Sequence, residues 1–110
     1  MDLEIQLFES LEEAHRVIPH LAIKPILIHQ KPYALARIGE VFYVFDRYCP
    51  HAAYDLSQGN ISPLKRIVCP WHNYQFSMDS GQEVSSRCKE LTIKKAYPKN
   101  GEGLFCKLSV

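Results

Sequence analysis

The chain has 110 residues, of which 46% are hydrophobic and 23% are charged, and its formal net charge at pH 7 is +1. This length and composition predict one ordinary globular domain covering residues 1–110. The absence of a basic block argues against nucleic acid as a partner, and no apolar run in the sequence is long enough to span a membrane.

The first expected elements are a short strand at residues 3–8 and a short helix directly after it. The helix prediction depends on Ser10 and Glu13, which are spaced as a capping box. The acidic N-terminal segment MDLEIQLFESLEE lacks the basic and apolar regions of a secretory signal, so we expect a cytoplasmic location.

From Pro25 onward the sequence has the composition of β-strands, rich in Val, Ile, Tyr and Phe. Strands are expected at residues 26–28, 33–38, 41–45, 73–78, 91–97 and 104–110. Gly39-Glu40 predicts a hairpin turn, a second turn should end at Gly81, and residues 98–103 should form the turn of a closing hairpin. The chain is therefore predicted to be mostly β, with one long excursion between about residues 46 and 76.

That excursion contains two short motifs, CPH at residues 49–51 and CPWH at residues 69–72. Thiolates and imidazoles are the ligands of zinc, copper and iron-sulfur sites, so Cys49, His51, Cys69 and His72 are the candidate ligands. A common zinc finger places two cysteines on one arm and two histidines on a following helix, whereas here each arm is mixed. A zinc-stabilised binding module therefore fits less well than an iron-sulfur centre, although it stays an alternative.

The two motifs resemble the Rieske 2Fe-2S signature, in which two histidines replace two cysteines on one of the two irons. The similarity continues in LSQG at residues 56–59 and in Phe76 with Gly81, and it covers most of residues 33–84. It implies an all-β fold, a Rieske-type antiparallel β sandwich or barrel with a small cluster-binding subdomain at about residues 46–76. It also implies one 2Fe-2S cluster per chain, with Cys49 and Cys69 on the inner iron and His51 and His72 on the outer one.

The sequence departs from the family pattern at several positions around this signature. Asn73 stands where members commonly have glycine, and we expect it to adopt a left-handed φ. SSRCKEL, at residues 85–91, replaces a Gly-Pro-rich third loop. High-potential members have a disulfide where this chain has Tyr54 and Trp71, and hydroxyl donors where it has Tyr74 and Phe76. These differences predict a reduction potential near the lower end of the Rieske range of about −150 to +300 mV.

The resemblance implies an electron carrier and not an enzyme, because a Rieske centre gains or loses one electron and has no open coordination position. The leading hypothesis is transfer of electrons from a flavoprotein reductase to a terminal oxygenase or another redox protein. The alternative within electron transfer is a small subunit of a larger reductase, similar to that of nitrite reductase.

The other histidines are expected to be surface residues or satisfied structural residues, and Cys106 a small core residue. His15, His20 and His29 have no partner at ligand spacing, and Cys106 lies in an alternating strand. Cys88 is read as a loop residue or an exposed thiol, and Trp71 as a shield for the cluster or an apolar docking point. Asp55 and Lys65 are candidate charges for steering a partner.

Overall fold

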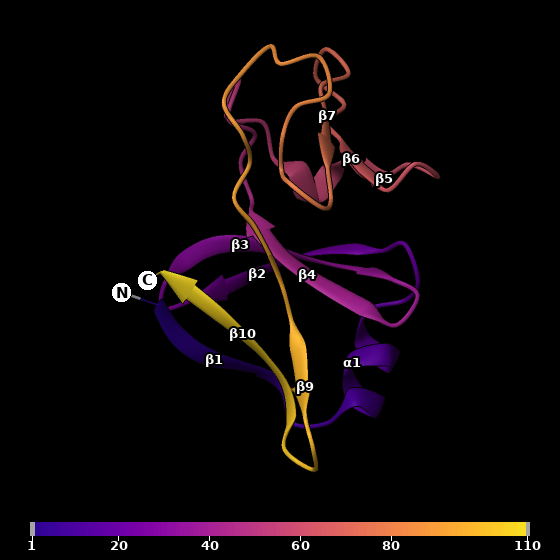
Figure 1. Cartoon of the computed structure of the whole chain (residues 1–110), viewed down its shortest axis with the longest axis vertical. Coiled ribbons are helices and arrows are strands. Elements are labelled where there is room, and N and C mark those ends of the chain that lie inside the picture. The colour runs from indigo at the N-terminus through magenta and orange to yellow at the C-terminus, as the bar shows by residue number, and fades with distance from the viewer. Residues whose placement is uncertain (1, 110) are drawn as a thin grey trace.

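The computed structural model describes residues 2–109, so Val110, the last residue of the predicted final strand, lies outside the described residues. Within this range the chain forms three antiparallel sheets (Figure 1). The elements in chain order are β1 (Asp2–Phe8), α1 (Leu11–Val17), β2 (Ile23–Ile28), β3 (Lys31–Ile38), β4 (Val41–Asp46), the 3-10 helix η1 (Leu56–Gln58), β5 (Asn60–Ile61), β6 (Arg66–Val68), β7 (Gln75–Ser77), β8 (Ile93–Lys95), β9 (Tyr97–Lys99) and β10 (Gly103–Ser109).

The β3–β4 hairpin is the centre of the fold because both of its faces are buried. It lies in a sheet of order β2-β3-β4-β8, and Gly39, with a φ of +59°, makes its turn as the sequence predicts. Side chains alternate between the two faces of a strand, so neighbouring residues of β3 and β4 enter different cores. Leu35 and Val44 pack into one core, whereas Ala34 and Phe45 pack into the other.

The first core lies in the base of the molecule, which we define as residues 2–46 and 93–109. It fills the space between this sheet and the sheet of order β1-β10-β9. Leu104, Cys106 and Leu108 of β10 face it, as the alternation in the sequence predicts, and Cys106 is completely buried. Ala14 of α1 and Ile18, the residue that caps the C-terminal end of this helix, belong to the same core.

No helix within residues 2–109 combines the length and the apolarity that crossing a bilayer requires.

The second core joins the hairpin to an upper lobe, which we define as residues 47–92. This lobe contains the small sheet β5-β6-β7 and stands above the base in Figure 1. Its buried side chains, among them Leu56, Ile67, Phe76 and Leu91, pack against Ala34 and Phe45 of the hairpin. The base therefore supports the lobe through one continuous apolar contact.

Several details of the predicted elements need correction. The strand expected at residues 73–78 is shorter, because Asn73 and Tyr74 belong to the loop before β7, and the strand expected at residues 26–28 begins earlier, at Ile23. Residues 91–97 were expected to form one strand, but β8 pairs with β4 whereas β9 pairs with β10, so this segment contributes to two sheets. The closing turn is consequently shorter than predicted, because Pro98 and Lys99 belong to β9. The capping box is half formed: Ser10 Oγ accepts from the Glu13 N–H at 3.0 Å, but the Glu13 carboxylate accepts from the Glu9 N–H instead of the Ser10 N–H.

Candidate metal centre

The candidate ligands lie on two loops of the upper lobe that are closed in the same way. In the first ligand loop, residues 47–55, the Cys49 N–H donates to the Tyr54 carbonyl at 2.8 Å. In the second ligand loop, residues 69–74, the Cys69 N–H donates to the Tyr74 carbonyl at 2.8 Å. Each bond spans five residues and encloses one Cys-Pro pair and one histidine, so the two loops present their candidate ligands on equivalent turns.

The second ligand loop turns through two consecutive left-handed residues. The φ angles of His72 and Asn73 are +65° and +54°. This region is uncommon for residues with a side chain, although asparagine enters it more readily than most. The expectation that Asn73 takes the place of a glycine in this conformation is confirmed.

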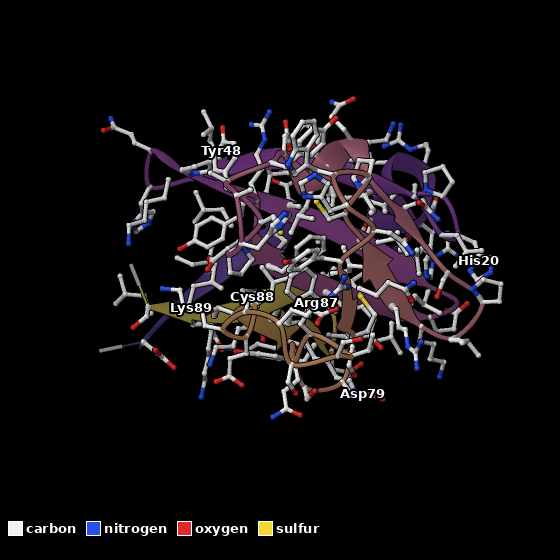
Figure 2. The ribbon with its side chains drawn as sticks, turned by 90° about the horizontal axis from the view of Figure 1, so that it is seen from above. His20, Tyr48, Asp79, Arg87, Cys88 and Lys89 are labelled. Atoms are coloured by element: carbon white, nitrogen blue, oxygen red, sulfur yellow. The ribbon has the colours of Figure 1, made fainter. Side chains whose placement is uncertain are left out.

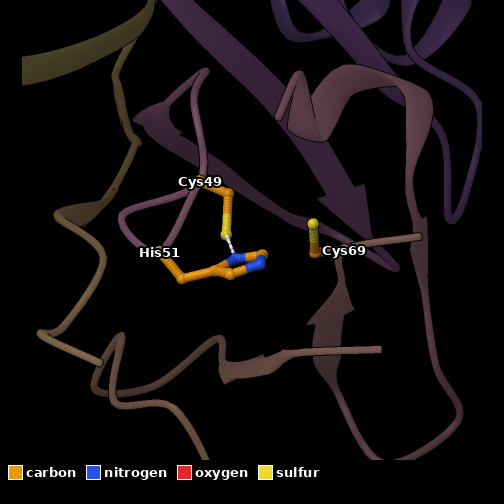
Figure 3. Close-up of side chains that lie close together, drawn as sticks. All are labelled: Cys49, His51 and Cys69. Atoms are coloured by element: carbon orange, nitrogen blue, oxygen red, sulfur yellow. Dashed lines mark hydrogen bonds between the residues drawn. The ribbon is translucent and has the colours of Figure 1, made fainter. Parts of the chain in front are cut away.

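Three of the four candidate ligands converge (Figure 3). The ligand atoms of Cys49, His51 and Cys69 lie within 4.8 Å of one another, and the Cys49 Sγ and His51 Nδ1 atoms are 2.8 Å apart. Cys49 and Cys69 are 2% and 0% exposed, whereas His51 is half-buried. The thiols therefore form the inner end of the group and the imidazole forms the outer end.

His72 lies beside this group but outside it. Its ring centroid is 5.9 Å from that of His51, and its side chain is exposed. A binuclear cluster distributes its ligands over two irons, so four donor atoms need not all lie at the spacing of a single metal ion. His72 therefore lies next to His51 and is exposed, whereas both cysteines are buried; the outer position that the family resemblance implies for it stays a prediction.

The chemistry of the donor set fits a metal better than free thiols. Burial raises the pKa of the Cys69 thiol to about 11, so this thiol is protonated at neutral pH without a nearby cation. Burial also lowers the pKa of His51, and the neighbouring His72 and Arg87 lower it further. The Nε2 atom of His51 is buried without a hydrogen-bond partner among the described residues. A bound metal would supply the positive charge that a buried thiolate needs, and neutral imidazole is the form that coordinates a metal.

A second layer of side chains covers His51, and sequence reasoning missed it. The Tyr74 ring stacks on the His51 ring at a centroid distance of 3.7 Å, with 11° between the planes. The guanidinium carbon of Arg87 lies 3.9 Å from the centroid of the Tyr74 ring. The same guanidinium forms an ion pair with Glu83. Glu83 and Arg87 are four residues apart in EVSSR, but no helix pattern in the sequence indicated that they would meet here.

The structure agrees only in part with the roles predicted for three other residues near the ligands. Trp71 is 49% exposed, and its ring packs 4.9 Å from that of His72, so it both covers one side of this histidine and faces solvent. Asp55 is not a free surface charge, because its carboxylate accepts two hydrogen bonds from Arg47 and caps η1. Cys88 is half-buried against the core that contains Cys49 and Cys69, so it is not a fully exposed thiol.

The remaining histidines have structural surroundings. His20 Nδ1 accepts a hydrogen bond from the Gly39 N–H, and His15 Nε2 lies 3.2 Å from the Glu40 carboxylate. His29 is an exposed residue of the β2–β3 turn. His15 and His20 thus have structural partners and His29 lies at the surface, which are the two kinds of position that the sequence predicts for them.

Comparison with known protein families settles the nature of the site. The family model of the Rieske 2Fe-2S domain matches residues 13–97, which is most of the chain. The chain belongs to the Rieske family. Its cofactor is accordingly a Rieske 2Fe-2S cluster, and Cys49, His51 and Cys69 form a possible binding group for it.

Similar proteins include ferredoxins, one of which is the ferredoxin component of an alkene monooxygenase system of Xanthobacter autotrophicus, 32% identical over 44 residues that are 40% of this chain and 36% of that protein. The Rieske chain is 33% identical to the ferredoxin CarAc of Metapseudomonas resinovorans over 72 residues, which are 64% of this chain and 66% of that ferredoxin. The aligned part thus spans just under two thirds of the relative.

Solved structures confirm the antiparallel β fold of the Rieske domain. One is a complex of reduced oxygenase and oxidised ferredoxin in carbazole 1,9a-dioxygenase, with a TM-score of 0.72, 24% identity and coverage of 94% of this chain and 91% of that chain. Another is provisionally named as an NADH-dependent nitrite reductase small subunit from Mycobacterium tuberculosis. Its TM-score is 0.77, its identity is 11%, and the match covers 100% of this chain and 98% of that chain.

Proposed function

We propose that this Rieske protein is a one-electron carrier with a low-potential 2Fe-2S cluster, which takes electrons from a flavoprotein reductase and passes them to a terminal oxygenase. The observation that carries the proposal is the convergence of Cys49, His51 and Cys69 from two loops within a Rieske domain. A ferredoxin relative and the fold of a ferredoxin seen in complex with its oxygenase support the choice of partners. The carrier itself catalyses no reaction in this proposal, and we place it in the cytoplasm.

The proposed ligands are Cys49 and Cys69 for one iron and His51 and His72 for the other. When bound, the cluster supplies a site that accepts and releases one electron without binding substrate. The protein keeps the thiol end dry, because Cys49 and Cys69 are buried, and it leaves His72 exposed at the surface. An acceptor that covers His72 therefore comes closer to the cluster than one that docks elsewhere on the lobe.

We also propose that residues 1–110 act as a single Rieske domain with a cluster-binding subdomain at about residues 46–76. The sheet β5-β6-β7 lies in this range apart from Ser77, and the bridge between Phe76 and Glu83 extends the same unit. The third loop, which we define as residues 83–88, therefore belongs with the subdomain in structural terms.

The test is to purify the protein and measure its metal content, its visible spectrum and its activity as a carrier. We expect a red-brown protein with about two irons and two acid-labile sulfides per chain. With NADH, a flavoprotein reductase and a terminal oxygenase, product should form only when this protein is added. A colourless folded protein with stoichiometric zinc would instead support the zinc-stabilised module, because zinc is a d¹⁰ ion.

The second candidate function is the electron-transfer small subunit of a larger reductase. It is favoured by the fold match to the nitrite reductase small subunit, which covers the whole of this chain. Co-purification with a large reductase subunit, together with failure to support any terminal oxygenase, would select this alternative.

A further inference from the structure

The buried carboxylate of Glu83 holds the third loop in a fixed conformation. Its side chain is 0% exposed, and it accepts hydrogen bonds from the backbone N–H groups of Gln75, Ser85 and Arg87 at 3.0 to 3.3 Å. It also accepts from Arg87 Nε at 3.1 Å and Arg87 Nη2 at 2.8 Å. A planar guanidinium bound at two atoms to a buried carboxylate has little freedom to rotate.

Arg87 connects this carboxylate to the second ligand loop. Its Nη2 also donates to the Asn73 carbonyl at 3.3 Å, and its guanidinium carbon lies 3.9 Å from the centroid of the Tyr74 ring. A cation over an aromatic face within about 6 Å is an attractive contact. Figure 2, which looks down on the upper lobe, shows Arg87, Cys88 and Lys89 along one loop, with Tyr48 on the opposite side of that face.

Tyr74 in turn links the two ligand loops. Its ring is stacked on His51 of the first loop at 3.7 Å, and its carbonyl accepts the hydrogen bond from Cys69 of the second loop. Glu83, Arg87, Tyr74 and His51 therefore form one column, and each member is held by the one before it. The guanidinium is separated from the His51 ring by a single aromatic ring.

We propose that Arg87 is a positioning residue for His51, acting through the Tyr74 ring, and that its fixed positive charge raises the reduction potential of the cluster. Reduction adds one negative charge to the cluster, and a nearby cation stabilises that charge. The Glu83 carboxylate offsets the Arg87 charge only in part, because the guanidinium contacts the Tyr74 ring and is therefore nearer to His51 than the carboxylate behind it. The stack also limits rotation of the His51 imidazole, which fixes the geometry of one side of the cluster. This inference depends on the proposed cluster ligands, but it concerns residues whose contacts no sequence motif indicates.

The test compares the potential and the reduced-state electron paramagnetic resonance spectrum of the purified holoprotein in three variants. In Arg87→Gln we expect the equilibrium between reduced and oxidised cluster to shift about tenfold toward oxidised, a fall of about 59 mV. The resonance lines should broaden, because His51 samples more orientations. In Arg87→Lys the charge is kept but the planar stack is lost, so the potential should recover in part while the lines stay broad.

Lys89→Gln is the matched control, since Lys89 is an exposed cation two residues further along the same chain segment. It removes the same charge without touching Tyr74, so its potential should shift less than about threefold and its lines should stay sharp. Equal shifts in Lys89→Gln and Arg87→Gln would overturn the proposal. A wild-type potential and spectrum in Arg87→Gln, or complete recovery of both in Arg87→Lys, would overturn it as well.

If Arg87→Gln alone does not retain the cluster, the double variant Glu83→Gln/Arg87→Gln takes its place. Its lines should broaden as in Arg87→Gln, whereas its potential should fall by less, because the negative charge of Glu83 is removed as well. Sharp lines in the double variant would overturn the positioning role of Arg87. The double variant leaves no buried carboxylate without its partner, which is the main risk of the single change. Iron and sulfide content of the wild type distinguishes failure of the proposed function from failure of the proposed role of Arg87. A wild type without cluster refutes the proposed function, whereas an intact wild type with an unaltered Arg87→Gln variant refutes only the role of Arg87.

Discussion

His72 combines an exposed side chain with a left-handed backbone, and both features bear on its proposed role as a ligand. A non-glycine residue in this region carries a conformational cost of about 1 kcal/mol, which persists only where the surroundings impose it. The closed turn from Cys69 to Tyr74 imposes it here and places the imidazole next to that of His51. The strain thus coincides with the point at which the cluster would meet solvent.

We expect His72→Ala to lose or disrupt the cluster, because it removes one of the four proposed ligands. His29→Ala is a matched control, since His29 is also exposed and also has a positive φ, of +50°, but lies in the β2–β3 turn. Iron and sulfide analysis should give about two of each per chain in the control and much less in His72→Ala. The upper lobe of His72→Ala should also be cut faster by protease, because the metal ties its loops together. Full cluster content in His72→Ala would remove His72 from the ligand set.

Phe76 is the residue that bears most directly on the predicted low potential. It is completely buried in the core that contains Cys49 and Cys69, and its ring has no group that can donate a hydrogen bond to a cluster sulfur. We expect a wild-type midpoint near the lower end of the range of about −150 to +300 mV. Phe76→Tyr should raise it, by about threefold in the redox equilibrium or roughly 30 mV, if the new hydroxyl reaches a sulfur. A wild-type midpoint above about +100 mV in a redox titration at neutral pH would show that the prediction of a low potential is wrong.

At the level of single residues, the candidate ligands were predictable because Cys-x-His and Cys-x-x-His are local motifs. The Arg87 column was not, because its four members come from three loops that meet only through the tertiary fold. The same limit applies to Asp55, whose charge was assigned to partner steering from sequence proximity alone. Its bonds to Arg47 depend on a loop geometry that the sequence does not reveal.

Among the elements, the turn that ends at Gly81 fixes how the third loop leaves β7. Gly81 has a φ of +79°, and a Cβ atom there would lie 1.9 Å from the Leu91 carbonyl oxygen. The Gly81 carbonyl also accepts a hydrogen bond from the Leu91 N–H at 2.8 Å. This close backbone contact returns the chain to the base after the third loop.

Gly81→Ala should therefore be clearly more destabilising than Gly101→Ala. Gly101 has a similar φ of +73°, but nothing lies within 4 Å of an added Cβ. The Gly101 change should cost about 1 kcal/mol, as expected for left-handed strain alone, and the Gly81 change should cost about 3 kcal/mol or more. Denaturant unfolding of both variants measures the difference. Equal losses of stability would mean that the loop relaxes freely away from Leu91.

The larger strands were predictable from composition and alternation, whereas the small elements of the upper lobe were not. β5 and β6 have two and three residues, too few for a period to be visible in the sequence. The division between β8 and β9 was missed because residues 91–97 read as one strand, and only the pairing with β4 and β10 separates them.

For the molecule as a whole, the two buried faces of the β3–β4 hairpin explain why one small chain can hold an exposed metal centre. The base closes one face with β10, and the upper lobe closes the other. The buried cysteines belong to that second core, so the cysteine end of the candidate metal centre is anchored to the central sheet. The histidine end is then free to face a partner.

The ligand loops and the residues beside them carry exposed aromatic side chains and two internal ion pairs. Trp71 and Tyr48 are 49% and 45% exposed. The nearby ion pairs Arg47–Asp55 and Arg87–Glu83 leave little net charge to attract a partner. An interface of this kind gains more from apolar contact than from long-range steering.

We therefore expect electron transfer to a terminal oxygenase to depend more on Trp71 than on ionic strength. Stopped-flow measurement of the second-order rate should show a change of less than about threefold between roughly 50 and 500 mM salt, because paired charges are weakly steering. Trp71→Ala should lower the rate by about tenfold while its cluster content stays normal, since an exposed aromatic anchor contributes about 1–2 kcal/mol to docking. Lys65→Gln is the control, because Lys65 is an exposed charge in the β5–β6 turn, which projects to the side of the upper lobe in Figure 1. A steep fall of the rate with salt, or a loss in Lys65→Gln as large as in Trp71→Ala, would instead establish that charge steers the partner.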